Sequence, residues 1–101
     1  MKKPHANSHQ NQADHHLYEI RDKQTNDTDK YGICGDPLLP DGSSPRANRQ
    51  LRVFNRIAGW KRFFTIILLM GIPGRKRAEE IEDEYIEAYR QKHGQKPPGN
   101  Q

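Results

Sequence analysis

The sequence predicts an α+β domain, in which a small three-stranded antiparallel sheet is flanked by two helices. Three observations support this fold class. Two short apolar segments near the N-terminus are separated by a polar turn, two later stretches carry helix start and stop residues, and one long apolar run lies between those stretches. The chain has 101 residues, of which 32% are hydrophobic, so one small domain with a modest core is expected.

Residues 1–16 have the composition of a disordered polar tail, which places the ordered domain at residues 17–101. Asn, Gln, Ser and His are common in this segment, and it has no apolar periodicity. His15 and His16 are adjacent, but no acidic or cysteine partner stands at a spacing that would complete a metal site. A solvated tail is therefore the simpler interpretation.

A β-hairpin is expected after the tail. Apolar and polar residues alternate over residues 17–20, which is typical of a strand, and the polar stretch over residues 22–29 indicates a turn. Residues 30–34 form the returning strand, and Gly35 and Pro37 end it.

A helix, a strand and a second helix follow the hairpin. Ser44 can cap the first helix and Pro45 suits its first position, while Gly59 ends it. The run over residues 60–70 is rich in aromatic and β-branched residues, so it is expected to be one buried strand. The second and longest helix is expected over residues 75–93.

Helical phase, at 100° per residue, places polar side chains on the apolar arcs of both helices. Glu82 falls well inside the apolar arc of the second helix, and Arg46 and Gln50 lie one turn apart inside that of the first. An inward carboxylate is unfavourable unless a cation, a metal or water accompanies it. Two interpretations follow: a structural Arg46–Glu82 ion pair, or a site where both residues converge on a phosphate.

The charge is distributed unevenly along the chain. The formal net charge is +4, yet the segment over residues 46–77 contains nine basic residues and no acid, whereas residues 78–93 contain six acids and two bases. Such a basic segment suits a polyanion such as nucleic acid, or it is a solvated face that pairs with the acidic helix. The candidate nucleic-acid contacts are Arg49, Arg52, Arg56, Lys61, Arg62, Arg75, Lys76 and Arg77.

Several classes of protein are excluded. A single cysteine, Cys34, excludes an internal disulfide and a zinc site built from several cysteines. The longest apolar run, residues 63–72, is about half of the roughly 20 residues that a spanning helix needs, so no membrane association is expected. No apolar segment follows the basic N-terminus, so a secretory signal is not expected, and the default location is the cytoplasm.

Tyr18, Gly32, Arg46, Glu82 and Asn100 stand in an order that resembles the GIY-YIG nuclease superfamily, and the similarity covers residues 17–100. Residues 31–33, 41–48, 72–75 and 97–100 also resemble nuclease tips of bacterial polymorphic toxins. The first half of the motif reads His16-Leu17-Tyr18 in place of Gly-Ile-Tyr, and the second reads Lys30-Tyr31-Gly32 in place of Tyr-Ile-Gly. Either Lys30 or Tyr31 therefore takes the place of the second tyrosine. The other matching positions are Arg46 in the first helix, Glu82 in the last helix and Asn100 after it.

This resemblance implies a metal-dependent endonuclease that hydrolyses phosphodiester bonds, with DNA favoured over RNA. Glu82 would hold one Mg²⁺ or Mn²⁺ ion and Arg46 would brace the phosphoryl oxygens. Tyr18 would orient or deprotonate the water, with its pKa lowered by the metal and the arginine. Lys30 or Tyr31 would support the water or the phosphate, and Asn100 would fix the substrate or the surroundings of Glu82.

The resemblance also implies a toxin effector that an acidic immunity protein would neutralise. The chain would then be secreted as the tip of a larger toxin and act in the cytoplasm of a target cell. The alternative function is a non-catalytic basic module that binds nucleic acid or a partner protein.

Overall fold

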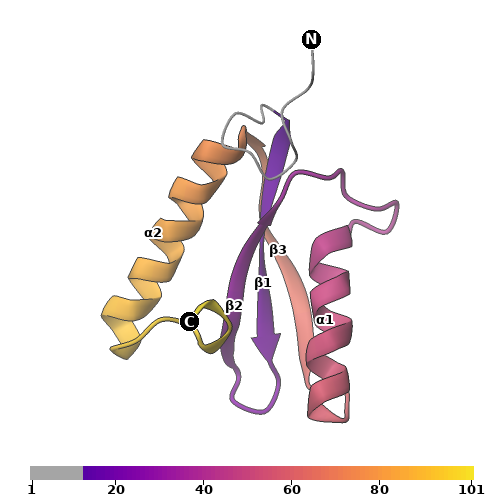
Figure 1. Cartoon of the computed structure of the whole chain (residues 1–101), viewed down its shortest axis with the longest axis vertical. Coiled ribbons are helices and arrows are strands. Elements are labelled where there is room, and N and C mark those ends of the chain that lie inside the picture. The colour runs from indigo at the N-terminus through magenta and orange to yellow at the C-terminus, as the bar shows by residue number, and fades with distance from the viewer. Residues whose placement is uncertain (1–12) are drawn as a thin grey trace.

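The structure, a computed structural model, describes residues 13–101 and confirms the predicted α+β fold and its element order (Figure 1). The sheet has the strand order β2-β1-β3, and both neighbouring pairs are antiparallel. The elements are β1 (Asp14–Asp22), β2 (Asp27–Cys34), α1 (Pro45–Ala58), β3 (Phe63–Pro73), α2 (Arg75–His93) and a short 3₁₀ helix, η1 (Pro98–Asn100).

Strand β1 begins at Asp14, ahead of the expected domain boundary at Leu17. His15 and His16 are buried in the sheet, so their assignment to a solvated tail is wrong. They pair with Ile72 of β3 and Cys34 of β2, respectively, and these long-range partners decide their burial. The rest of the expected tail, residues 1–12, lies outside the described residues.

The two helices pack against opposite faces of the sheet, and Figure 1 shows one on either side of it. Leu17 belongs to a core cluster that includes Ile81 and Tyr85 of α2. Its neighbour Tyr18 belongs to a second cluster, which includes Leu51 of α1. Because successive strand residues point to opposite faces, the central strand β1 contributes to both clusters.

The ends of α1 follow the predicted capping. The Ser44 hydroxyl accepts a hydrogen bond from the Ala47 backbone N–H at 3.2 Å, and Pro45 occupies the first turn. Gly59 ends the helix in the left-handed conformation, at φ +82°. Within residues 13–101, no helix combines the length and the apolar character needed to cross a membrane.

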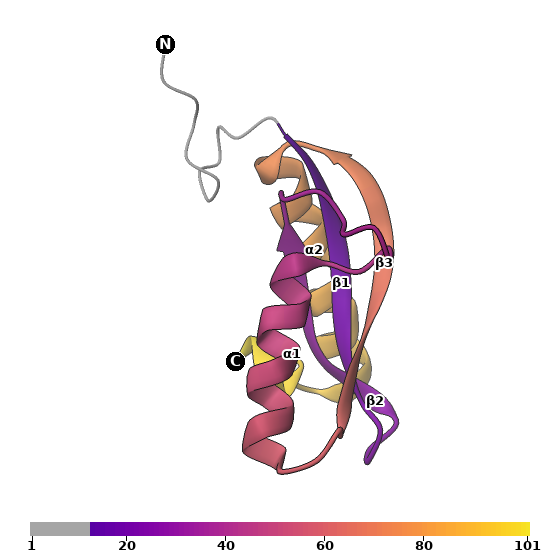
Figure 2. The same ribbon diagram turned by 90° about the vertical axis from the view of Figure 1, so that its right-hand side faces the viewer.

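Strand β3 differs from its prediction in position and in burial. It spans Phe63–Pro73 rather than residues 60–70. Within residues 13–101 it pairs with β1 alone and forms an edge of the sheet, along the curved ribbon seen in Figure 2. Phe64, Ile66, Leu69 and Met70 are therefore exposed, although a continuous apolar run is typical of a buried strand. The apolar composition could not reveal that, in the part of the chain that the structure describes, no second strand pairs with β3.

Candidate active site

Four elements and the C-terminal segment meet around a polar cavity of about 300 Å³ beside β2. Five of the six predicted catalytic residues line it, namely Tyr18, Lys30, Arg46, Glu82 and Asn100. They come from β1, β2, α1, α2 and η1, so the fold brings together positions that are far apart in the sequence. The other lining residues are Gly32, Ile33, Gln50, Arg75, Gly99 and Gln101.

Tyr18 is held in place by residues on β2 and α1. Its side chain is fully buried, and its hydroxyl donates a hydrogen bond to Gln50 Oε1 at 2.6 Å. The ring lies directly over Gly32, where an added β-carbon would overlap the phenol. The glycine of the second half-motif is thus required because the tyrosine of the first half-motif packs against it.

Burial raises the pKa of Tyr18 to about 12, and the positive charge of Arg46 offsets this increase only in part. Arg46 thus lowers the Tyr18 pKa as expected, but by less than burial raises it, and the lowering by a metal ion stays a prediction. At neutral pH the Tyr18 hydroxyl is uncharged, so it can donate to Gln50 and still accept a hydrogen bond through its oxygen.

Glu82 turns inwards, as the helical phase predicted, and burial raises the pKa of its carboxyl group. The neighbouring cations that oppose this increase in the Glu82 pKa are Lys30 and Arg75. The positive charge of Arg46 instead lowers the pKa of Tyr18. The structural Arg46–Glu82 ion pair is therefore not the arrangement found, although both residues line the same cavity.

The donor set of this cavity suits one hard cation with several waters. Glu82 is the one acidic side chain among the lining residues. Across residues 13–101, no cluster of three or more His, Cys, Asp or Glu side chains could enclose a metal ion. Mg²⁺ prefers such a site, because it keeps most of its water ligands and binds few carboxylates. Glu82 could hold the ion here, with open polar space around it.

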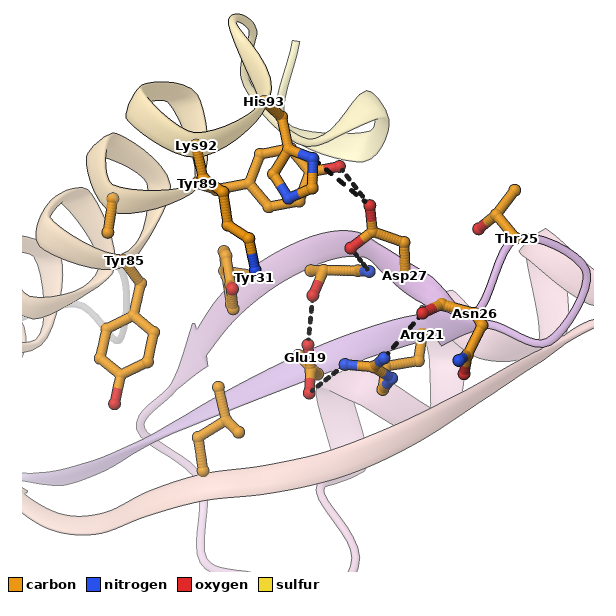
Figure 3. A pocket seen from close by; sticks show the side chains of 13 residues that line it. Glu19, Arg21, Thr25, Asn26, Asp27, Tyr31, Tyr85, Tyr89, Lys92 and His93 are labelled. Carbon is orange, nitrogen blue, oxygen red and sulfur yellow. Dashed lines mark hydrogen bonds and ion pairs between the residues drawn. The ribbon is translucent and has the colours of Figure 1, made fainter.

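Side-chain alternation along β2 separates the two candidates for the second motif tyrosine. Lys30 lines the cavity, whereas Tyr31 points to the opposite face and packs edge-to-face on Tyr85, with ring centroids 5.5 Å apart (Figure 3). Tyr31 is therefore not brought to the site, and of the two alternatives Lys30 is the one that remains.

Asn100 acts as an extra pairing partner for the outer edge of β2. Its amide accepts a hydrogen bond from the Tyr31 N–H at 2.8 Å and donates one to the Tyr31 carbonyl oxygen at 2.9 Å. Gly99 permits this approach, because a β-carbon there would lie 2.8 Å from Lys30 Cβ. Asn100 thus fixes η1 against β2 at the rim of the cavity.

The predicted nucleic-acid contacts fall into two groups. Arg62 forms a two-pronged ion pair with Asp22, at 2.9 and 2.7 Å, which lowers the pKa of that carboxyl group and occupies the guanidinium. Arg75 and Arg77 pair with Glu79 and Glu80 within α2, although Arg75 also lines the cavity. The members without such an ion pair are Arg49, Arg52, Arg56, Lys61 and Lys76, which are all exposed, and Arg77 is exposed as well.

Comparison with known proteins identifies the family of this chain. Residues 8–94 match the model of the family URI fold toxin 2, and this match covers β1 through α2, with Asn100 beyond it. No curated protein and no solved structure matches the chain. The chain therefore belongs to the URI fold toxin 2 family, which confirms the prediction of a toxin domain.

Proposed function

We propose that this toxin domain is an endonuclease that hydrolyses phosphodiester bonds with one Mg²⁺ or Mn²⁺ ion, and that DNA is its favoured substrate. The observation that carries the proposal is the cavity lined together by Tyr18, Lys30, Arg46 and Glu82. Phosphodiester hydrolysis needs an oriented water and positive charge around the phosphate, and this cavity provides groups suited to both.

Each residue has a distinct role in the proposed mechanism. Glu82 holds the ion, which when bound neutralises charge on the phosphate and makes a water more acidic. Arg46 binds phosphoryl oxygens through its guanidinium fork, and Lys30 adds a further positive charge. The Tyr18 hydroxyl donates to Gln50 Oε1, so its oxygen accepts a hydrogen bond from the attacking water. A bound ion would lower the pKa of Tyr18 from its value of about 12 in the metal-free protein, so Tyr18 would orient the attacking water or take its proton.

The proposal extends to the partner and to the place of action. An acidic immunity protein would neutralise the domain in the producing cell, because the exposed basic residues of α1 offer it a complementary surface. The domain would act in the cytoplasm of a target cell after delivery as part of a larger toxin.

The function is tested by incubating the purified chain with supercoiled plasmid and with total RNA, in magnesium and in chelator. We expect magnesium-dependent nicking of the plasmid by the parent chain and none by Glu82→Ala. Nicking that persists in chelator or in Glu82→Ala would refute the assignment. Binding of nucleic acid without any cleavage would favour a non-catalytic basic module.

A further inference from the structure

A second cavity lies on the other face of the sheet, between the strands and the C-terminal half of α2. This cavity, here called the α2–sheet groove, has a volume of about 630 Å³, and Figure 3 shows side chains from β1, β2 and α2 converging on it. Strand β2 separates it from the candidate active site, because Tyr31 lines the groove whereas Lys30 lines the active-site cavity. The proposed mechanism gives the groove no role.

Three tyrosines provide aromatic surface in the α2–sheet groove. Tyr31 and Tyr85 contact each other edge-to-face, and Tyr89 is stacked on His93 with ring centroids 4.0 Å apart. The Tyr89 hydroxyl donates a hydrogen bond to Asp27 Oδ2 at 3.1 Å, which fixes the ring. Each tyrosine is only half-buried, so part of the aromatic surface stays open to a planar ligand, although His93 already covers one face of Tyr89.

Glu19 places a hydrogen-bond acceptor on the floor of the groove. Its side chain is buried, and Oε2 accepts a hydrogen bond from the Thr28 hydroxyl at 2.5 Å. Its other oxygen, Oε1, forms an ion pair with Arg21 Nη1 at 3.6 Å, a separation too long for a hydrogen bond. Oε1 can therefore accept a hydrogen bond from an N–H group of a ligand.

The charges in the groove favour a neutral ligand. Glu19 and Asp27 are balanced by Arg21 and Lys92, which line the same space. The two bases would repel a cationic ligand, and the two carboxylates would repel an isolated anion. A neutral, planar group with N–H donors fits both the aromatic surface and the acceptor, and a nucleobase is such a group.

We infer that the α2–sheet groove binds an unpaired nucleobase of the nucleic acid whose backbone occupies the candidate active site, an inference that rests on the proposed nuclease function. The two sites share a wall, because Asn100 at the rim of the active-site cavity is hydrogen-bonded to the backbone of Tyr31. A base inside a duplex is paired and stacked, so it cannot offer its edge to Glu19. The substrate class is therefore single-stranded or locally unpaired nucleic acid.

The test measures binding of short fluorescent single strands, and of a duplex of the same length, to the full chain in chelator. We expect the single strands to bind more tightly than the duplex. Tyr89→Leu should weaken single-strand binding by about 5- to 150-fold, which corresponds to the loss of one stacked base. Tyr89→Phe should keep most of the binding, because the ring and its stacking contact with His93 remain although the hydrogen bond to Asp27 is lost. Trp60→Leu, which removes an exposed aromatic residue outside the groove, is the matched control and should leave binding unchanged.

Photocrosslinking of the unmodified chain to iodouracil-substituted single strands provides a test that does not depend on the folding of a variant. Crosslinks at Tyr85 or Tyr89 are expected. Unchanged binding by a folded Tyr89→Leu, preference for the duplex, or crosslinks confined to the active-site cavity would overturn the inference. Tyr89-dependent binding without cleavage would uphold the groove while refuting the nuclease, and cleavage without Tyr89-dependent binding would refute the groove alone.

Discussion

The position of the Tyr18 phenol is fixed by contacts that the sequence reveals only in part. Helical phase placed Gln50 on the apolar side of its helix, but it could not indicate the bond to Tyr18, which lies 32 residues earlier. The resemblance predicted Gly32 without giving its physical reason, which is the ring packed against it. The sequence alone left Lys30 and Tyr31 as alternatives. The position of β2 in the sheet shows which side of the strand lines the cavity, and Lys30 is on that side.

Gly32→Ala should displace the Tyr18 ring, because the new β-carbon would overlap it. We expect a loss of about 1–3 kcal/mol in the free energy of unfolding, measured by urea denaturation, and weaker nuclease activity. The same substitution in a Tyr18→Ala background is the control. An equal loss of stability in both backgrounds would show that the ring is not the cause.

His15 and His16 show where composition misleads. Both have a polar side chain in a polar segment, yet they are 1% and 4% exposed in β1, and the Nε2 atom of each is buried without a hydrogen-bond partner. Their burial depends on strands β2 and β3, which are distant in the sequence. No local pattern could have predicted it.

Acid should destabilise the fold through His16. Burial lowers the pKa of His16 below 6.5, its ordinary value, so the unfolded chain binds the proton more tightly than the folded one. Its contribution to stability is complete above pH 6.5 and declines as the pH falls below that value, by up to about 1.4 kcal/mol per pH unit. Urea denaturation from neutral to mildly acidic pH should show a smaller decline for His16→Gln than for the parent. An identical decline would contradict this origin.

At the scale of elements, the two edges of the sheet differ. The outer edge of β2 is covered by η1 and by the Asn100 amide, whereas β3 keeps an open edge with exposed apolar side chains. The caps of α1 and the order of the elements follow from local residues, so the sequence predicted them well. Edges depend on which strands pair, and for that reason the burial of β3 was predicted wrongly.

Asn100→Ala should uncover the edge of β2. It removes two hydrogen bonds to the Tyr31 backbone, each worth about 0.5–1.5 kcal/mol. Hydrogen exchange of the Tyr31 amide should become faster, by up to roughly tenfold. Gln101→Ala is the matched control, because that side chain bonds to the Lys96 carbonyl and not to β2. An unchanged exchange rate of the Tyr31 amide in Asn100→Ala would mean that the two Asn100–Tyr31 hydrogen bonds do not hold η1 against β2.

At the scale of the whole molecule, the fold places a basic surface and a polar cavity on the α1 side of the sheet. The net charge of +4 does not show how the charges are distributed over the surface. Arg62 is paired with Asp22, whereas Arg52 and Arg56 are exposed on α1. Charge counting along the sequence predicted the basic segment. It could not predict which basic residues are already paired, since Asp22 is the last residue of β1 and Arg62 precedes β3, 40 residues later.

The exposed arginines of α1 should give nucleic-acid binding its dependence on salt. Replacing Arg52 and Arg56 with glutamine should lower the slope of log affinity against log salt by about 0.7–0.9 for each phosphate that is no longer neutralised. Binding titrations at several salt concentrations measure this slope. Arg90→Gln, which removes an exposed charge near the end of α2, should change it less. Equal effects of all three substitutions would indicate that only the net charge matters.

The most direct measurement compares magnesium-dependent plasmid nicking by the parent chain, Glu82→Gln and Glu84→Gln. Both carboxylates lie on α2, but Glu82 lines the cavity and Glu84 is exposed. We expect Glu84→Gln to nick like the parent, and Glu82→Gln to fold at least as stably as the parent yet lose nicking by more than about a hundredfold. Parent-like nicking by a folded Glu82→Gln would contradict the catalytic role of the inward carboxylate and, with it, the proposed nuclease.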